Sequence, residues 1–292
     1  YSSDGKLLLA GGADGVATIW NIETGVMHRQ WNAHASAVHS VSFYDDDSQA
    51  LTSCLDRDVK RWKFNDKNAE VLSVLSHPAD VRVVRCNEGS KGFVTGCEDG
   101  QVRFWNQEGQ ADGTSIQADG EVVAIDFNAS GKTIAVAYLN KETSRWEVGF
   151  WDLENRSRLP QRLHCRRRFR SVRYSPDDKF LLTGDDDWEA NLWHADSGEL
   201  YATLLQDGNA SSVDFSPDSA NLIVACEDTA SVNTLEIKQI ETLRKQNGVF
   251  VHRFGHSSLL HRSRLLQAKF SPDARSFVST CAEGLIRVWA PG

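Results

Sequence analysis

The chain has 292 residues and a net charge of −8, with 40% hydrophobic and 25% charged residues, a composition typical of globular domains. No apolar run is long enough to cross a bilayer, so we expect no membrane partner. The negative charge disfavours general binding to nucleic acid. Because no targeting segment is recognisable, we expect an intracellular, cytoplasmic protein, with a nuclear location left open.

Seven turn-like segments recur along the chain and divide it into seven units. Each mixes Ser, Asn, Asp, Gly or Pro, residues that close tight turns, and each lies between stretches that we predict to be strands. In chain order they are YSSDGK from Tyr1, FYDDDSQ from Phe43, CNEGSK from Cys86, FNASGK from Phe127, YSPDDK from Tyr174, FSPDSA from Phe215 and FSPDAR from Phe270. Their starts are 42, 43, 41, 47, 41 and 55 residues apart, and a period in the forties predicts the four-stranded blades of a β-propeller.

A tryptophan follows most of these segments at a fixed distance. Five tryptophans stand 19 residues after the start of their segment, namely Trp20, Trp62, Trp105, Trp193 and Trp289. In the fourth unit Trp151 stands 24 residues on, and in the sixth Thr234 takes the place of the tryptophan. The predicted fold class is therefore all-β, a seven-bladed β-propeller of four-stranded antiparallel blades.

These residues resemble the WD-repeat family, whose units end a strand in Trp-Asp and carry Gly-His upstream. Intact and degenerate forms of the two dipeptides are Trp151-Asp152, Gly255-His256, Trp20-Asn21, Trp105-Asn106 and Ala33-His34. The resemblance covers essentially the whole chain. It implies a propeller that binds other macromolecules, without indicating which.

In that family a His, a Ser or Thr, an Asp and the Trp of one repeat form a hydrogen-bonded chain. Carried over by register, the resemblance implies four such sets: His34, Thr52, Asp56 and Trp62 in the second repeat; His77, Thr95, Asp99 and Trp105 in the third; His164, Thr183, Asp187 and Trp193 in the fifth; His256, Ser279, Glu283 and Trp289 in the seventh. The fourth repeat, with Ala118 and Val136, and the sixth, with Gln206, Val224 and Thr234, have lost the set. A half-satisfied buried network is costly, so we expect members to be lost together.

These sets resemble catalytic triads in composition, but we interpret them as structural. The pattern recurs blade by blade, and it ends in an indole, which can only donate a hydrogen bond. No GxSxG, HExxH, phosphate-binding or dinucleotide-binding motif is present. We therefore expect no enzyme activity and no cofactor.

The six cysteines follow the same register. Four of them, Cys54, Cys97, Cys226 and Cys281, stand eight residues before the tryptophan position of their unit. We interpret these four as small packing residues and all six as free thiols. Because no CxxC pair occurs, we expect no zinc site.

We expect residues 1–292 to form a single propeller domain that lacks two strands. The chain starts at the turn before a second strand and stops just after a third strand. The outer strand of the last blade and the inner strand of the first are then absent. We predict that residues upstream of Tyr1 supply both and close the ring.

Loops on one rim, conventionally the top, are the predicted partner-binding site. Five extra residues of the fourth unit fall within Asn140–Trp146, and about five more residues are expected on the top side within Ser257–Arg264. The candidate binding residues are Arg145, Trp146, Arg166, Arg167, Arg168, Arg170 and Trp188. Arginine beside aromatic residues is typical of binding hot spots and favours an acidic or phosphorylated peptide. The alternative is that the arginines only neutralise Asp185–Asp187.

A non-catalytic interaction scaffold for protein or peptide partners, within a multi-subunit complex, is the leading functional hypothesis. A sensor propeller appended to an upstream kinase or nucleotide-binding module is the first alternative. Nucleic-acid binding through the regions of Arg166 and Arg262 is the second. The stretch Ile240–Arg253 fits either a short helix or a long edge hairpin.

Overall fold

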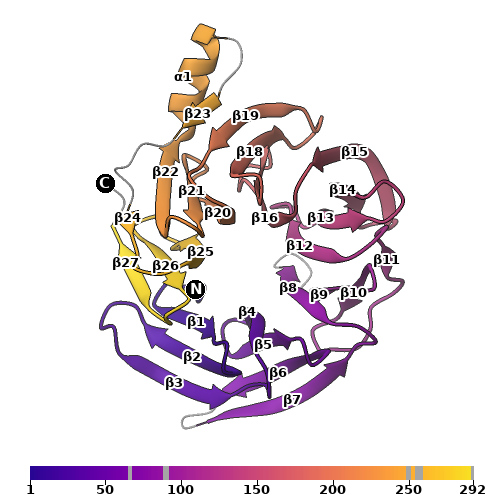
Figure 1. Ribbon diagram of the computed structural model, residues 1–292. Helices are drawn as coiled ribbons and strands as arrows, with labels where there is room; N and C mark the ends of the chain where they lie inside the picture. Colours follow the sequence, from indigo (N-terminus) through magenta and orange to yellow (C-terminus); the bar gives the residue numbers. More distant parts are fainter. Residues whose placement is uncertain (65–67, 88–91, 248–250, 254–258, 291–292) are drawn as a thin grey trace. The chain divides into compact units, whose positions relative to one another are not determined.

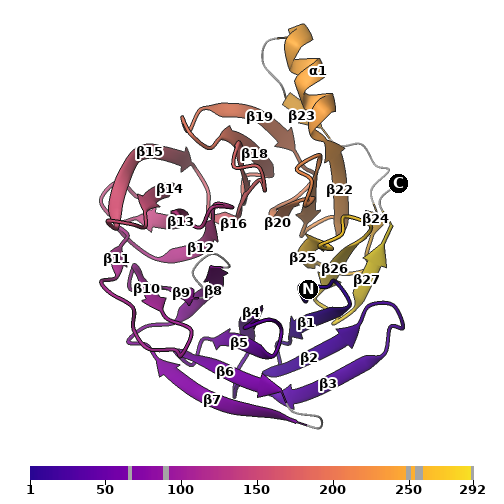
Figure 2. The same ribbon diagram turned by 180° about the vertical axis from the view of Figure 1, so that it is seen from behind.

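The computed structural model describes residues 1–64, 68–87, 92–247, 251–253 and 259–290 (Figure 1). Seven β-sheets follow one another along the chain, and their strands are antiparallel to their neighbours except for β23 at the edge of the fifth sheet. They are the blades of the predicted seven-bladed β-propeller, so the predicted fold class is confirmed. Figure 2 shows the same elements from behind.

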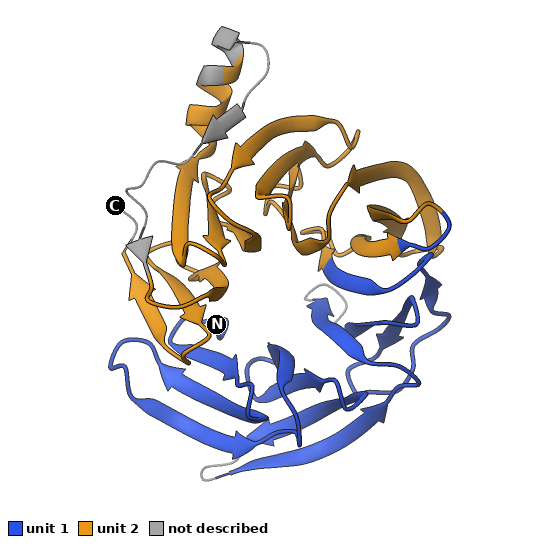
Figure 3. Ribbon diagram, in the orientation of Figure 1, with its two compact units in different colours: residues 1–125, 140–142 blue, residues 126–139, 143–292 orange. Residues whose placement is uncertain are grey.

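The chain divides into two compact units, coloured in Figure 3: residues 1–125 with 140–142, and residues 126–139 with 143–292. The first sheet holds β1 (Leu7–Gly11), β2 (Val16–Asn21) and β3 (Met27–Asn32); the second, β4 (Val38–Tyr44), β5 (Gln49–Cys54), β6 (Asp58–Phe64) and β7 (Ala69–Ser76); the third, β8 (Val81–Asn87), β9 (Gly92–Cys97), β10 (Gln101–Trp105) and β11 (Ile116–Gln117). These three blades belong to the first unit.

Blades four to seven continue the series. The fourth sheet holds β12 (Val122–Phe127), β13 (Thr133–Asn140), β14 (Arg145–Asp152) and β15 (Ser157–Cys165); the fifth, β16 (Phe169–Tyr174), β17 (Phe180–Asp185), β18 (Glu189–His194), β19 (Leu200–Leu205) and β23 (Val251–Arg253); the sixth, β20 (Ala210–Phe215), β21 (Asn221–Cys226), β22 (Ser231–Glu236) and β24 (Leu259–Leu260); the seventh, β25 (Leu265–Phe270), β26 (Phe277–Cys281) and β27 (Ile286–Trp289). The one helix of the described residues is α1 (Ile237–Asn247).

The first and the last of these sheets have three strands each among the described residues. That residues before Tyr1 complete them, and that the whole chain acts as one domain, stay predictions.

The core lies between successive sheets, because the second strand of a blade is buried on both faces. All six residues of β9, β17 and the last five of β21 are buried. One core cluster joins the fifth and sixth sheets, where Leu192 and Leu204 pack with Phe215. Another joins the sixth and seventh sheets, where Ile223 packs with Phe277. Each sheet therefore depends on its neighbour to cover an apolar face.

The surplus of the sixth unit forms a helix followed by an added strand. Ile237 and Ile240 of α1 are buried in the core cluster of the fifth and sixth sheets. The chain then returns as β23, which pairs parallel to β19 with Thr203 opposite Val251. Of the two structures left open for Ile240–Arg253, the helix is found, and β23 extends the fifth blade to five strands.

Three further placements differ from or complete the expectations. His261 stands nine positions before Phe270, as His34 stands nine before Phe43, so the part from His261 to Arg264 holds no surplus, while Ser257 and Ser258 of the expected surplus lie outside the described residues. The extra length lies between β22 and β24 instead. In the fourth blade the extra residues lengthen β13 and β14 to eight residues each.

The recurring turn segments share one backbone device at their fifth residue. That residue has a positive φ in six blades, at Gly5, Asp47, Gly131, Asp178, Ser219 and Ala274. In the Ser-x-Asp versions the serine hydroxyl also accepts the backbone N–H five residues on, as Ser271 does from Ser276 at 3.0 Å. The turn thus needs a left-handed residue, which glycine adopts without the Cβ penalty.

Ala274→Gly is therefore expected to stabilise the chain, because φ at this position is +59°. We expect a gain of about 0.5–1 kcal/mol in the free energy of unfolding, measured by urea denaturation. The matched control is Ala129→Gly, in the equivalent turn of the fourth blade but without a positive φ. It should leave stability unchanged or lower it, and equal effects of the two substitutions would contradict the argument.

Candidate functional site

The second blade holds a complete four-member polar chain. The Trp62 indole donates to Thr52 Oγ1 at 2.9 Å, His34 Nε2 lies 2.8 Å from the same hydroxyl, and His34 Nδ1 lies 2.9 Å from the Asp56 carboxylate. An indole only donates and a carboxylate only accepts, so the protons run from Trp through Thr and His to Asp. Desolvation raises the pKa of Asp56, but hydrogen bonds from His34 and the Asp58 N–H outweigh it and leave this pKa below its usual value.

The third blade keeps three members and redirects the fourth. Trp105 donates to Thr95 at 3.0 Å, and His77 Nε2 lies 2.9 Å from the same hydroxyl. His77 Nδ1 donates to the Leu75 carbonyl, while Asp99 pairs with Arg103 at 2.7 Å. The expected bond between His77 and Asp99 is therefore not formed. Burial lowers the pKa of His77, which keeps the imidazole neutral.

In the seventh blade the histidine is not the predicted one. The predicted His256 lies outside the described residues. The contact with Ser279 that we expected from His256 is made by His261 Nε2, at 2.6 Å. Trp289 donates to Ser279 at 2.7 Å, as predicted. Glu283 is exposed and does not join, so this set has three members.

In the fifth blade the predicted histidine is also displaced. Trp193 donates to Thr183 at 3.0 Å, but the His164 side chain is 52% exposed and faces Glu147 at 3.8 Å. The residue 18 before Thr183, the spacing of His34 from Thr52, is Cys165. Asp187 makes only a backbone contact to Asp185 among the described residues, so the fifth set is reduced to two members.

A cysteine–aspartate pair replaces the missing members of the fifth blade. The Cys165 thiol donates to Asp185 Oδ2 at 3.1 Å, and the N–H groups of Asp187 and Glu189 donate to Asp185 Oδ1. Asp185 is fully buried at the register where four other blades carry cysteine. Burial raises its pKa to about 6, against these hydrogen bonds.

The four register-equivalent cysteines are buried, and all six are free thiols. One group among the described residues, His34, Cys54 and Asp56, brings three potential metal-ligand atoms within 4.8 Å of one another. Both ring nitrogens of His34 are already hydrogen bonded to Thr52 and Asp56. The group thus serves as part of the structural chain described above.

The predicted binding residues gather at one edge of the fourth and fifth sheets. Arg166–Arg168 connect β15 to β16, and the Asp186 N–H donates to the Arg168 carbonyl, which places the β17–β18 turn with Trp188 on the same edge. Trp146, at the start of β14, lies opposite Cys165 at the end of β15. We call Arg145, Trp146, Arg166–Arg168 and Trp188 the basic edge.

Three arginines of the basic edge, Arg145, Arg166 and Arg167, are exposed and form no ion pair among the described residues. The Arg168 guanidinium lies 5.6 Å from the centre of the Trp146 ring, a cation–π contact. Trp188 is 55% exposed, in a turn with φ of +66°.

Arg170, in contrast, belongs to an internal ion-pair network. It lies 2.5 Å from Asp186 and 3.9 Å from the buried Glu227, which Arg264 contacts from the other side. The sequence analysis included pairing of the arginines with Asp185–Asp187 as its alternative, but it missed Glu227 and Arg264. The signal was available, because Glu98, Asp186 and Glu227 all follow the cysteine register by one residue.

Comparison with known proteins now adds to this geometry. The family model described as "WD domain, G-beta repeat" matches residues 1–21, 25–63, 69–106, 161–194 and 248–290, more than half of the chain. The chain belongs to the WD-repeat family. WD-repeat propellers are generally non-catalytic protein-interaction scaffolds.

Individual WD-repeat relatives are distant. A serine-threonine kinase receptor-associated protein from Dictyostelium discoideum is 26% identical over 99% of this chain and 92% of its own length. From Arabidopsis thaliana, the transcriptional corepressor LEUNIG_HOMOLOG is 26% identical over 77% of the chain and a WD repeat-containing protein 26 homolog 21% identical over 90%. The chain spans only 28% and 44% of these two plant proteins. No helix among the described residues is long and apolar enough to span a membrane.

The polar chain of the second blade predicts that removing the Thr52 hydroxyl destabilises the fold. Thr52→Val keeps the side-chain shape but leaves the Trp62 indole and His34 Nε2 without their partner. We expect the free energy of unfolding to fall by about 2–4 kcal/mol in urea denaturation. Thr133→Val is the matched control, since the Thr133 side chain makes no hydrogen bond among the described residues, and a similar loss there would refute the role of Thr52.

The buried Asp185 predicts a pH dependence of stability. Its pKa in the folded chain is raised to about 6, so the stability it contributes is complete below the unfolded pKa near 3.8 and is lost as pH rises to about 6. Asp185→Asn removes this titration. Relative to wild type, the variant should therefore gain stability between pH 4 and pH 7, measured by thermal unfolding. Asp187→Asn is the control, and a parallel pH profile for the two variants would disprove the assignment.

Proposed function

We propose that this WD-repeat chain is a non-catalytic scaffold whose basic edge binds an acidic or phosphorylated segment of a partner protein. The observation that supports this most directly is the freedom of Arg166 and Arg167, which are exposed and unpaired within the described residues. Buried or paired arginines would have to exchange partners before binding, whereas these two need only lose water and side-chain freedom.

The neighbouring acidic residues Asp185–Asp187 form no ion pair with Arg166 or Arg167 among the described residues. Asp186 pairs with Arg170, and Asp185 is buried against Cys165. Of the two explanations for the arginine cluster, neutralisation accounts for Arg170 but not for Arg166 and Arg167. We therefore remove Arg170 from the proposed contact set and keep the basic edge.

The aromatic residues of the basic edge add a cation–π contact and an exposed apolar ring to its positive charge. The Arg168 guanidinium lies over the Trp146 ring. A planar guanidinium matches carboxylate and phosphate oxygens with two parallel hydrogen bonds. Trp188 offers a large exposed ring on the same edge. An extended acidic segment with one apolar residue would use both kinds of contact.

The test is affinity capture with quantitative mass spectrometry, comparing wild type with Arg166→Glu/Arg167→Glu. We expect the variant to lose partners by about tenfold or more, because charge reversal replaces attraction with repulsion. The control Lys238→Glu/Arg275→Glu makes the same change of charge at two other exposed positions and should retain them.

Phosphatase treatment of the extract separates the two partner chemistries. Loss of the captured partners after treatment identifies phosphorylated segments, and their retention identifies acidic ones. An unchanged partner set for Arg166→Glu/Arg167→Glu would refute the proposal.

A further inference from the structure

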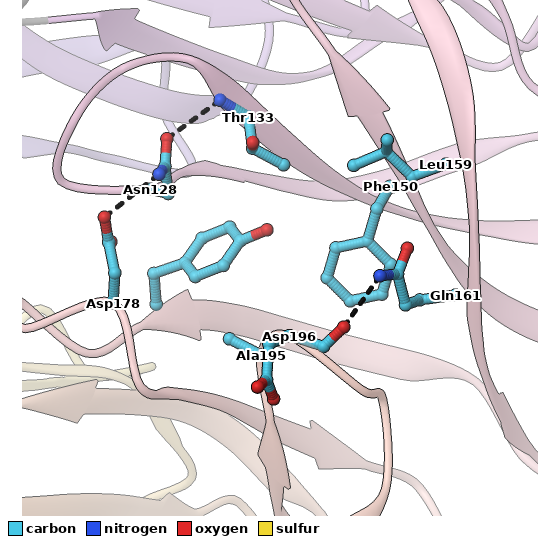
Figure 4. A pocket seen from close by; sticks show the side chains of 9 residues that line it. Asn128, Thr133, Phe150, Leu159, Gln161, Asp178, Ala195 and Asp196 are labelled. Atoms are coloured by element: carbon cyan, nitrogen blue, oxygen red, sulfur yellow. Dashed lines mark hydrogen bonds between the residues drawn. The ribbon is translucent and has the colours of Figure 1, made fainter.

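A cavity of about 200 Å³ lies between the fourth and fifth sheets at the edge opposite the basic edge (Figure 4). Its apolar wall includes Phe150 and Leu159, which Figure 4 shows on one side together with Gln161. Asp178 stands on the other side, and Asp196 lies in the β18–β19 turn. The cavity thus combines an apolar lining with several oxygen atoms.

Two polar groups of the lining have no hydrogen-bond partner among the described residues. Tyr174 is only 9% exposed, and its hydroxyl makes no hydrogen bond there. Gln161 Nε2 donates to the Asp196 carbonyl at 2.7 Å, but the buried Gln161 Oε1 accepts nothing. A buried polar atom is rarely left without a partner, so Gln161 Oε1 indicates a missing donor, and the Tyr174 hydroxyl of the same lining, which is not fully enclosed, can take part in the same contact.

The fold does not require the Tyr174 hydroxyl. The same register position, at the end of the first strand, holds Phe127, Phe215 and Phe270 in the fourth, sixth and seventh blades. The Tyr174 ring packs edge-on against Phe150 with centres 6.4 Å apart, which a phenylalanine would also do. The first unit also has a tyrosine at this position, Tyr1, so the position accepts either ring and the packing against Phe150 does not depend on the hydroxyl.

The cavity is also negative. The Asp178 carboxylate accepts from Asn128 Nδ2 at 3.0 Å and from the Ala129 N–H at 2.6 Å, neutral donors that leave its charge in place. Asp196 is exposed at the rim and accepts from the Ser197 N–H. No lysine or arginine is among the residues that line the cavity.

We propose that this cavity binds the basic side chain of a partner protein, an ammonium or guanidinium group on an aliphatic stem. The stem would lie against Phe150 and Leu159, and the cation would donate to Gln161 Oε1 and Tyr174 Oη beside the Asp178 carboxylate. Such a cation also gains from neighbouring aromatic faces. This site has the opposite charge preference to the basic edge and does not depend on it.

The probe is the capped tripeptide Gly-Arg-Gly, titrated into the full chain and followed by NMR or calorimetry. Three further tripeptides carry lysine, citrulline or norleucine at the central position. We expect saturable binding of the arginine or lysine peptide, and the tighter of the two identifies the preferred cation. Citrulline keeps the shape of arginine without its charge and norleucine keeps the stem alone, so both should bind at least about tenfold more weakly.

Two variants locate the binding. Tyr174→Phe should weaken binding by about threefold to tenfold through the loss of one hydrogen bond, with an unchanged melting temperature. Leu159→Trp should block the cavity by filling it. Tyr201→Phe makes the same chemical change as Tyr174→Phe outside the cavity and should bind as wild type does.

The proposal is overturned if neither basic peptide binds, if citrulline binds as well as arginine, or if Tyr174→Phe and Tyr201→Phe behave alike. Arg166→Glu/Arg167→Glu should retain full binding of the basic tripeptide. Its failure in partner capture would thus bear on the basic edge alone.

Discussion

The hydrogen bond from the third-strand tryptophan to a second-strand hydroxyl is the interaction around which four of the seven blades build their polar centre. It is present in the second, third, fifth and seventh blades, with lengths of 2.9, 3.0, 3.0 and 2.7 Å. The histidine joins in three of these blades and the aspartate in one. An indole must place its single donor somewhere when the sheet is covered on both faces, and the hydroxyl one strand away is the nearest acceptor. The histidine and the aspartate can vary because they only complete the hydrogen bonding of that hydroxyl, the histidine directly and the aspartate through the histidine.

Blades without this bond contain other buried polar groups instead of a purely apolar centre. In the sixth blade Gln206 accepts from Asn233 at 2.8 Å and from Cys226 at 3.2 Å. In the fourth, the fully buried Tyr138 donates to Glu147 at 2.8 Å, and Arg158 neutralises that carboxylate. The expectation that members are lost together was too simple. A polar group at the blade centre is satisfied by whichever neighbour the sequence supplies, and the physical requirement is satisfaction rather than one residue set.

The period of the turn segments was enough to predict the fold, because it depends only on which residues close tight turns. The polar sets were predicted less well for a specific reason. His164 and His256 were assigned by an approximate repeat register, whereas the spacing from the hydroxyl is constant: His34, His77 and His261 each stand 18 residues before their Thr or Ser. Counting back from Thr183 and Ser279 would have found Cys165 and His261. The exchange of cysteine and aspartate in the fifth blade could not be found that way, since it depends on Cys165 at the end of β15 meeting Asp185 at the end of β17.

The positions of the charged residues along β16 explain why one edge of the fourth and fifth blades is basic and the opposite edge is negative. Arg170 points into the ion-pair network with Asp186 and Glu227, so it is held by the fold. Arg166 and Arg167 lie before the strand begins, where no neighbouring sheet presents an acid to them among the described residues. Four residues after Arg170, the same strand ends at Tyr174, which borders the negative cavity. One short strand, β16, thus separates the basic edge from the negative cavity. Because the strand fixes the separation of the two proposed sites, an acidic and a basic group of any partner would meet this chain at opposite ends of β16.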